Sequence, residues 1–174
     1  KVIGFEVSKG FATSVSFFSS NDWSEELNVS EDNKDFDLNA KIEVTNKPNE
    51  IDTADKIVLP GVGSFFDCLS AVKSIDGILE SLQDQVINKQ KKFIGICVGM
   101  QLLADIGYEN GENEGFQWIS GSVEKIQTQP GYQIPHMGWN NVNHKNSKLF
   151  KDIDDGSDFY FVHSYEFKTN AKNI

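Results

Sequence analysis

The chain has 174 residues, of which 39 % are apolar and 24 % are charged. This length suits one domain with a packed core, and no apolar run approaches the roughly 18 residues that span a bilayer. The net charge of −10 disfavours nucleic acid as a partner, because phosphate groups would be repelled. Two cysteines are too few for a disulfide framework, and no basic-then-apolar leader opens the sequence. Together these features favour the reducing cytoplasm.

The N-terminal region shows little regular pattern. Strands are expected at residues 2–7 and 40–45, with a short helix at residues 11–18. Residues 19–39 are rich in Asn, Asp, Ser and Glu without a helical or strand period, which is typical of an exposed loop or insertion. We assign no functional residue to this region.

The middle of the chain alternates apolar strands with helices. Residues 56–59 and 93–96 are short, unbroken apolar runs, which is typical of strands covered on both faces of a parallel sheet. Two helices are expected between these runs. Their inward positions are predicted to be Phe65, Leu69, Val72, Ile78, Leu82 and Val86, with Phe66 and Ile75 as further candidates.

The second apolar run leads into Cys97, after which a helix is expected to carry Met100, Leu102 and Leu103. A polar, glycine-rich loop follows at residues 107–115. Shorter strands are expected at residues 121–126, 139–142 and 159–162. Strands that alternate with helices predict an α/β fold, with a mostly parallel sheet flanked by helices, in a single domain over residues 1–174.

The sharpest chemical signal is Gly95-Ile96-Cys97-Val98-Gly99, which has the pattern glycine, any residue, nucleophile, any residue, glycine. This pattern places a nucleophile in a strained turn between a strand and a helix, where small neighbours let the chains pass closely. The helix would point its positive end at the sulfur and favour the thiolate, and the N–H of Val98 would face an oxyanion. A buried cysteine between two glycines is the alternative, and the preceding strand and following helix favour the nucleophile.

Cys68 has a simpler interpretation. It lies in Phe65-Phe66-Asp67-Cys68-Leu69, within an expected helix, and is predicted to be a small buried apolar residue.

The loop Pro60-Gly61-Val62-Gly63 follows the first apolar strand, at the same end of the sheet as Cys97. Loops at the carboxyl ends of parallel strands line the crevice of such a fold. A glycine-flanked loop there can turn its N–H groups toward an anion. Beside the cysteine motif, it is expected to form the second half of an oxyanion hole.

These two segments resemble the class I, triad-type glutamine amidotransferases, which have a flavodoxin-like architecture. Two later segments, Pro135-His136-Met137-Gly138-Trp139-Asn140 and Tyr160-Phe161-Val162-His163-Ser164-Tyr165, look like the glutaminase subunit of imidazole glycerol phosphate synthase. The resemblance runs from about residue 41 to the end of the chain. Four motifs in the same order make a chance match very improbable.

The resemblance implies that Cys97 attacks the side-chain amide of glutamine and forms a thioester. It implies oxyanion donors at Val62 and Val98. It implies substrate-binding roles for Gly61, Gly63, Gln101, Ser164 and Tyr165, with no cofactor and no metal. Ammonia would pass to a separate cyclase subunit, a (β/α)₈ barrel in a heterodimer, which makes imidazole glycerol phosphate in histidine biosynthesis.

The family completes its triad with a His-Pro-Glu motif near the C-terminus, and this sequence has none. His136 and His163 match other positions of the family motifs, and His144 lies in a polar loop where we expect a solvated side chain. None of the three is assigned as the base. The chain also ends in mid-pattern, so we expect a truncated protein that is a poor glutaminase as written.

Two alternatives stay open. A paralogue that feeds ammonia to a different synthase, such as one modifying a surface sugar, shares these motifs. A non-catalytic subunit that keeps the fold and lacks the base is a second possibility. Trp139 is expected to face the partner subunit or the ammonia exit, so Trp139→Ala should weaken subunit coupling more than folding.

Overall fold

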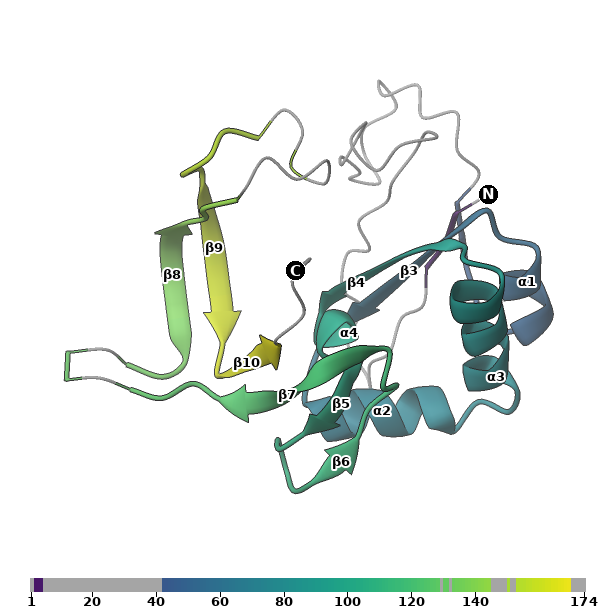
Figure 1. Ribbon diagram of the computed structural model, residues 1–174, viewed down its shortest axis with the longest axis horizontal. Helices are drawn as coiled ribbons and strands as arrows, with labels where there is room; N and C mark the ends of the chain where they lie inside the picture. The colour runs from purple at the N-terminus through teal and green to yellow at the C-terminus, as the bar shows by residue number, and fades with distance from the viewer. Residues whose placement is uncertain are drawn as a thin grey trace.

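The computed structural model describes residues 2–4, 42–128, 130–131, 133–144, 150 and 153–169. Their strands form three sheets. Figure 1 shows a layered body with a two-stranded ribbon standing beside it. The expected helix at residues 11–18 and the expected loop at residues 19–39 lie outside the described residues. Within the described residues, no helix is long and apolar enough to cross a membrane.

The first sheet is entirely parallel and has the strand order β2-β1-β3-β4. Its strands are β1 (Val2–Gly4), β2 (Ile42–Val44), β3 (Lys56–Gly61) and β4 (Lys92–Cys97), which confirms the strands expected in these regions. Ile57, Val58 and Leu59 follow one another in β3 and point to alternate faces. All three are buried, so both faces of this strand are covered. β4 is only half-buried and lies at the edge of the four strands.

Helices α1 (Pro48–Asp52), α2 (Phe65–Lys73) and α3 (Ile78–Gln83) belong to the same body, and α3 continues into the π-helical turn η1 (Asp84–Asn88). The predicted inward positions are confirmed, with Val86 and Ile75 partly buried against the core. Phe66 is the exception, because it is 46 % exposed. It follows Phe65 by one residue, which turns it about 100° away from the buried stripe.

The start of α2 is defined by its capping residue. The hydroxyl of Ser64 accepts a hydrogen bond from the backbone N–H of Asp67 (3.1 Å) and donates one to the Asp67 carboxylate (2.8 Å). The first bond satisfies a helix N–H group that would otherwise have no partner, and the second holds the Ser64 hydroxyl in place. Because Ser64 directly follows Gly63, the cap also fixes where the loop after β3 ends.

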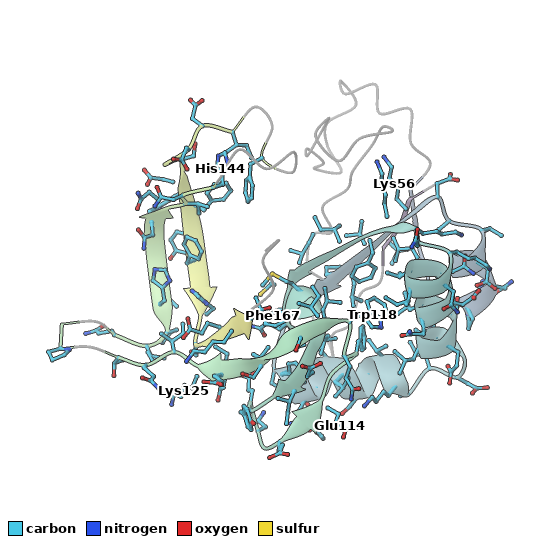
Figure 2. The ribbon with its side chains drawn as sticks, viewed as in Figure 1. Lys56, Glu114, Trp118, Lys125, His144 and Phe167 are labelled. Carbon is cyan, nitrogen blue, oxygen red and sulfur yellow. The ribbon has the colours of Figure 1, made fainter. Side chains whose placement is uncertain are left out.

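The second sheet has the order β10-β7-β5-β6, in which β5 and β7 are parallel and the other pairs antiparallel. Its strands are β5 (Ala104–Gly107), β6 (Asn113–Glu114), β7 (Ile119–Lys125) and β10 (Tyr165–Thr169). The loop expected at residues 107–115 therefore contains a short strand. Trp118 closes the core here, at 5.3 Å from the Phe93 ring and 5.1 Å from the Phe116 ring. Figure 2 shows Trp118 and Phe167 near the middle of the body.

The ribbon consists of β8 (His136–Asn141) and β9 (Asp158–His163), an antiparallel pair in which His136 lies opposite His163. Alternate residues face opposite sides. One face exposes a set of large apolar side chains, which we call the apolar ribbon face: Met137, Trp139, Tyr160 and Val162. The other carries His136, Phe161 and His163.

The expectation of a solvated His144 is wrong. The residue lies at the end of the ribbon farthest from β10 (Figure 2) and is half-buried. Its Nε2 donates to the carbonyl of Ile153 (2.9 Å), and its ring stacks on Phe150 at 4.7 Å. The polar neighbours in the sequence did not reveal this packing.

Candidate active site

Cys97 is the last residue of β4, and α4 (Val98–Gln101) begins directly after it. Its backbone has φ 55° and ψ −119°, a conformation that a residue with a side chain rarely adopts. Such strain costs on the order of 1–3 kcal/mol and persists only where the surroundings impose it. The side chain is exposed, so the turn presents the thiol to solvent.

Close backbone contacts hold this turn in place. A Cβ added at Gly99 would overlap the carbonyl oxygen of Leu59. A Cβ added at Gly61 would lie 2.5 Å from the Gly99 nitrogen, and one added at Gly95 would lie 2.6 Å from the Gly99 oxygen. The glycines therefore let α4 rest directly on β3 and β4, and this crossing imposes the conformation of Cys97.

Helix α4 is shorter than expected, with four residues. Leu102 and Leu103, which were expected within this helix, are buried in the turn that follows it, whereas Met100 is 41 % exposed. A single turn has little macrodipole of its own. It still offers the free backbone N–H groups that begin every helix.

The loop after β3 lies beside Cys97 because Gly61 and Cys97 are partners in the β3–β4 register. Gly63 has φ +117°, which favours glycine because a side chain would be strained there. The carbonyl of Val62 accepts a hydrogen bond from the Cys68 thiol of α2 (3.4 Å). The loop is thus held on one side by the strand pairing and on the other by the helix.

A cavity of about 510 Å³ opens at this point. It brings together every residue to which the sequence assigned a catalytic, oxyanion or substrate-binding role, namely Gly61, Val62, Gly63, Cys97, Val98, Gln101, Ser164 and Tyr165. The remaining lining residues are Pro60, Ile96, Glu109, Pro135, Val162 and His163. Two segments far apart in sequence therefore form the walls, one from the ends of β3 and β4 and one from the turn between β9 and β10.

Gln101 connects these two walls. Its side chain is 7 % exposed, and its Nε2 donates to the carbonyl of Tyr165 (3.3 Å). The bond joins α4 to the first residue of β10 across 64 positions of sequence. The amide therefore holds the far wall at a set distance from Cys97.

Glu109 is a lining residue that the sequence analysis missed. Among the described residues that line the cavity, it alone is acidic. Its Oε2 accepts a hydrogen bond from the backbone N–H of Phe65 (2.7 Å) at the start of α2. A carboxylate here offers a cation a partner. A lone glutamate in a polar loop carries no sequence signal of this position.

His163 also lines the cavity, but both nitrogens of its ring are engaged. Nδ1 lies 3.1 Å from the Tyr165 carbonyl, and Nε2 lies 2.8 Å from Nδ1 of His136. His144 is held by Ile153. Both ring nitrogens of His163 therefore have hydrogen-bond partners, although this residue lines the cavity with Cys97.

The two cysteines differ sharply in surroundings. Cys68 is 1 % exposed, and burial, reinforced by the nearby Asp67 carboxylate, raises the pKa of its thiol to about 11. The thiol is therefore neutral and shielded, as the sequence predicted. Cys97 is the exposed thiol of the pair. Across the described ranges, no three His, Cys, Asp or Glu side chains converge as a metal site would require.

Comparison with known proteins adds a family and a set of relatives. The family "Glutamine amidotransferase class-I" matches residues 25–174. Similar curated proteins, each named imidazole glycerol phosphate synthase subunit HisH, come from Pelagibacter ubique (47 % identity over 135 residues) and Rhodospirillum rubrum (44 % over 138 residues). These matches span 76 % and 78 % of this chain, and 65 % and 64 % of the respective relative. The chain thus covers just under two thirds of the length of these relatives.

Proposed function

The chain belongs to the class I glutamine amidotransferase family, and on that premise we propose that its cavity hydrolyses the side-chain amide of glutamine through a thioester on Cys97. One observation carries the proposal. The exposed thiol sits on a strained turn whose strand partner, Gly61, begins the loop that faces it. Cys97 and the two segments to which we assign the backbone donors line one cavity, which supports acyl transfer.

The reaction begins when the Cys97 thiolate attacks the amide carbon and a carbon–sulfur bond forms. The carbonyl electrons move to oxygen, where the N–H groups of Val62 and Val98 stabilise the negative charge. Collapse of this intermediate breaks the carbon–nitrogen bond, and the nitrogen leaves as ammonia after gaining a proton. Water then attacks the thioester, which releases glutamate and restores the thiol.

Glutamine binding is assigned to the rest of the lining. Gly61, Gly63, Gln101, Ser164 and Tyr165 hold the substrate, in agreement with their shared position around the cavity. We add Glu109, whose carboxylate is placed to attract the α-ammonium group. A volume of about 510 Å³ falls within the usual range for small-molecule sites.

The proton transfers need a base that the described residues do not offer to Cys97, because His163 uses both ring nitrogens elsewhere. We therefore propose that the base comes from outside the described residues. The 174-residue chain should then react at Cys97 with an electrophile and turn over glutamine slowly, since a triad without its base loses most of its rate.

We further propose that the chain is the glutaminase part of an imidazole glycerol phosphate synthase, and that it passes ammonia to a cyclase subunit with a (β/α)₈ barrel. The similar proteins are imidazole glycerol phosphate synthase subunits, which supports this choice over a sugar-modifying synthase. The apolar ribbon face supports a protein partner, because Trp and Tyr are enriched where interfaces are fully desolvated.

Labelling by a diazo ketone analogue of glutamine tests the hydrolase proposal. Alkylation joins the Cys97 sulfur to the reagent carbon and releases dinitrogen, so mass spectrometry should find one adduct per chain. Cys97→Ser should abolish it, Cys68→Ser should not, and free glutamine should slow it. Glu109→Gln should weaken that protection about tenfold, as expected for a lost charged contact. Labelling that glutamine never slows would overturn the proposal.

Association with candidate synthases tests the partner. The chain should be retained by an imidazole glycerol phosphate cyclase and not by a sugar-modifying synthase, and Trp139→Ala should weaken retention about thirtyfold if Trp139 is an anchor. The proposal is wrong if the sugar-modifying synthase is retained instead. It is also wrong if a cyclase assayed with the chain runs on ammonia but shows no glutamine-dependent rate at all.

A further inference from the structure

A chain of hydrogen bonds runs from the ribbon into the cavity. Nδ1 of His136 contacts Nε2 of His163 (2.8 Å), and Nδ1 of His163 contacts the carbonyl of Tyr165 (3.1 Å). The same carbonyl accepts from Nε2 of Gln101 (3.3 Å). We propose that His136 and His163 form a positioning pair that holds the Tyr165 carbonyl, and through it Gln101, in the geometry that binds glutamine. The substrate in this inference rests on the function proposed above.

The hydrogen-bond partners determine the tautomer of each ring when the pair is neutral. A carbonyl oxygen only accepts, so Nδ1 of His163 must carry a hydrogen. When His163 is neutral, its Nε2 is then an acceptor, and Nδ1 of His136 must donate to it. Both rings are therefore Nδ1–H tautomers, and both donate in the direction of the cavity.

The position of the pair in the ribbon makes this contact more than a chance approach. His136 and His163 are direct register partners at the end of the ribbon nearest β10. The His136 ring stacks on Phe161, with centroids 4.9 Å apart and planes 21° apart. Phe161 also lies 5.7 Å from the His163 ring. The aromatic neighbour thus restricts the rotation of both imidazoles.

The Tyr165 carbonyl, which the pair holds, lies at the cavity, so its displacement would change the shape of the proposed glutamine site. Tyr165 is the first residue of β10, directly after the turn that forms the far wall of the cavity. The carbonyl takes one donor from each wall, His163 from the ribbon and Gln101 from α4. Pairing of β10 with β7 restrains the backbone here, and His163 and Gln101 add the side-chain donors to this carbonyl. Without the His163 donor, the Gln101 amide would have a less constrained partner.

Two substitutions at one position separate positioning from packing. In His163→Leu the Nδ1 donor is lost, whereas in His163→Asn the side-chain amide nitrogen replaces it at a similar distance from the backbone. Loss of one hydrogen bond should weaken glutamine binding about three- to tenfold in His163→Leu, measured by calorimetry on the full chain. His163→Asn should stay within about twofold of the wild type. His136→Leu should show a smaller loss than His163→Leu, because the direct bond to Tyr165 remains.

The chain supplies a matched control in His144. This residue also donates a ring N–H to a carbonyl, that of Ile153, and also stacks on an aromatic ring, but it lies at the opposite end of the ribbon. His144→Leu should leave glutamine affinity unchanged. The alkylation rate of Cys97 with iodoacetamide, which does not resemble glutamine, should be the same in all these variants.

A ligand-free measurement keeps the pair testable apart from the substrate. Nitrogen-15 spectra of the imidazoles, recorded where both rings are neutral, should show the Nδ1–H tautomer for each. The side-chain amide signals of Gln101 should shift in His163→Leu and return toward the wild-type position in His163→Asn. An unchanged Gln101 amide in His163→Leu would overturn the inference.

The outcomes separate the two proposals. The proposed substrate is refuted if the wild-type protein binds no glutamine and glutamine does not slow its labelling. In that case the Gln101 amide signals still test the positioning pair. If the wild type binds glutamine and His163→Leu binds it equally well, the pair has no positioning role. If His163→Asn loses as much affinity as His163→Leu, the effect belongs to packing and the inference is also wrong.

Discussion

Cys97 lies in a body where β3 passes between two neighbouring strands, whereas the β8–β9 ribbon has only two strands and stands beside that body (Figure 1). In the body, Leu59 and Phe65 are completely buried. On the ribbon, Trp139 is 73 % exposed and Tyr160 is 55 % exposed. Two strands rarely support a core of their own, so the difference indicates that stability comes from the body and that the ribbon's apolar side chains serve contacts made elsewhere.

The same contrast applies to backbone geometry. Around Cys97, glycines at 61, 95 and 99 place strand and helix in direct backbone contact. In the ribbon, Gly138 has open space around it. The nucleophile is therefore held by contacts that tolerate no extra atom, whereas the wall carried by the ribbon depends on side-chain hydrogen bonds that a substitution can loosen without unfolding the protein.

The largest expected difference in stability is between two aromatic truncations, one in the body and one in the ribbon. Phe65→Ala should lower the free energy of unfolding by about 3–5 kcal/mol, because it removes a fully buried ring and leaves a cavity. Tyr160→Ala should lower it by less than about 1 kcal/mol, since more than half of that ring already faces solvent. Urea denaturation monitored by fluorescence measures both. Equal losses would mean that the ribbon contributes to the core after all.

A methyl group added to a glycine gives the next contrast. Gly99→Ala should cost about 3 kcal/mol in unfolding free energy, because the new Cβ would overlap the Leu59 carbonyl in a rigid crossing. Gly138→Ala should cost only about 1–2 kcal/mol, because its φ of +142° is strained for alanine while the space is open. Thermal and urea unfolding of the two variants, compared with the wild type, gives the order. The crossing is less rigid than described if Gly99→Ala is the milder change.

Alkaline pH should act on the body through Cys68. Its pKa of about 11 in the folded state lies above the ordinary value of 9.0, so above pH 9 the unfolded chain releases this proton first. Stability from this group is fully present below pH 9 and is lost as the pH rises toward 11, by up to about 3 kcal/mol. The measurement is the difference in unfolding free energy between wild type and Cys68→Ala across this range. A difference that does not change with pH would contradict a shielded thiol.

How far the sequence predicts the fold depends on whether a feature is local. β3 and β4 are predictable because short apolar runs have few other structures open to them, and the Cys97 turn is predictable because each glycine around it has a steric reason. β10 is not among the predicted strands, although Tyr165 and Phe167 alternate with polar residues and pack against the core. The segment is short and directly follows another strand, so its boundary is hard to recognise. Phe66 is a candidate for the core by its apolar character, which does not show which way a helix faces, and the structure exposes it.

The site divides in the same way. The turn at Cys97 and the loop at Gly61 are each one continuous segment, so the sequence could identify them. The position of Glu109 at the cavity and the contact of His136 with His163 depend on how distant segments meet, across 44 and 27 positions respectively. No local pattern encodes a β8–β9 register, which the turn and the packing of the whole chain determine.

The smallest expected effect on stability belongs to Trp139→Ala. The ring is 73 % exposed and makes one aromatic contact in the described residues, an edge-on approach to Tyr160 at 5.5 Å. Its loss should change the unfolding free energy by less than about 0.5 kcal/mol. The matched variant in the body is Trp118→Ala, which removes a ring packed on Phe93 and Phe116 and should be clearly destabilising.

The two variants together decide what the exposed ring of Trp139 does. If Trp139→Ala destabilises the isolated chain as much as Trp118→Ala does, Trp139 serves folding, and the apolar ribbon face is not a partner surface. If Trp139→Ala is stable but the cyclase retains it more weakly, the exposed ring serves binding. An indole that contributes nothing to folding has its whole exposed area available to contact another protein.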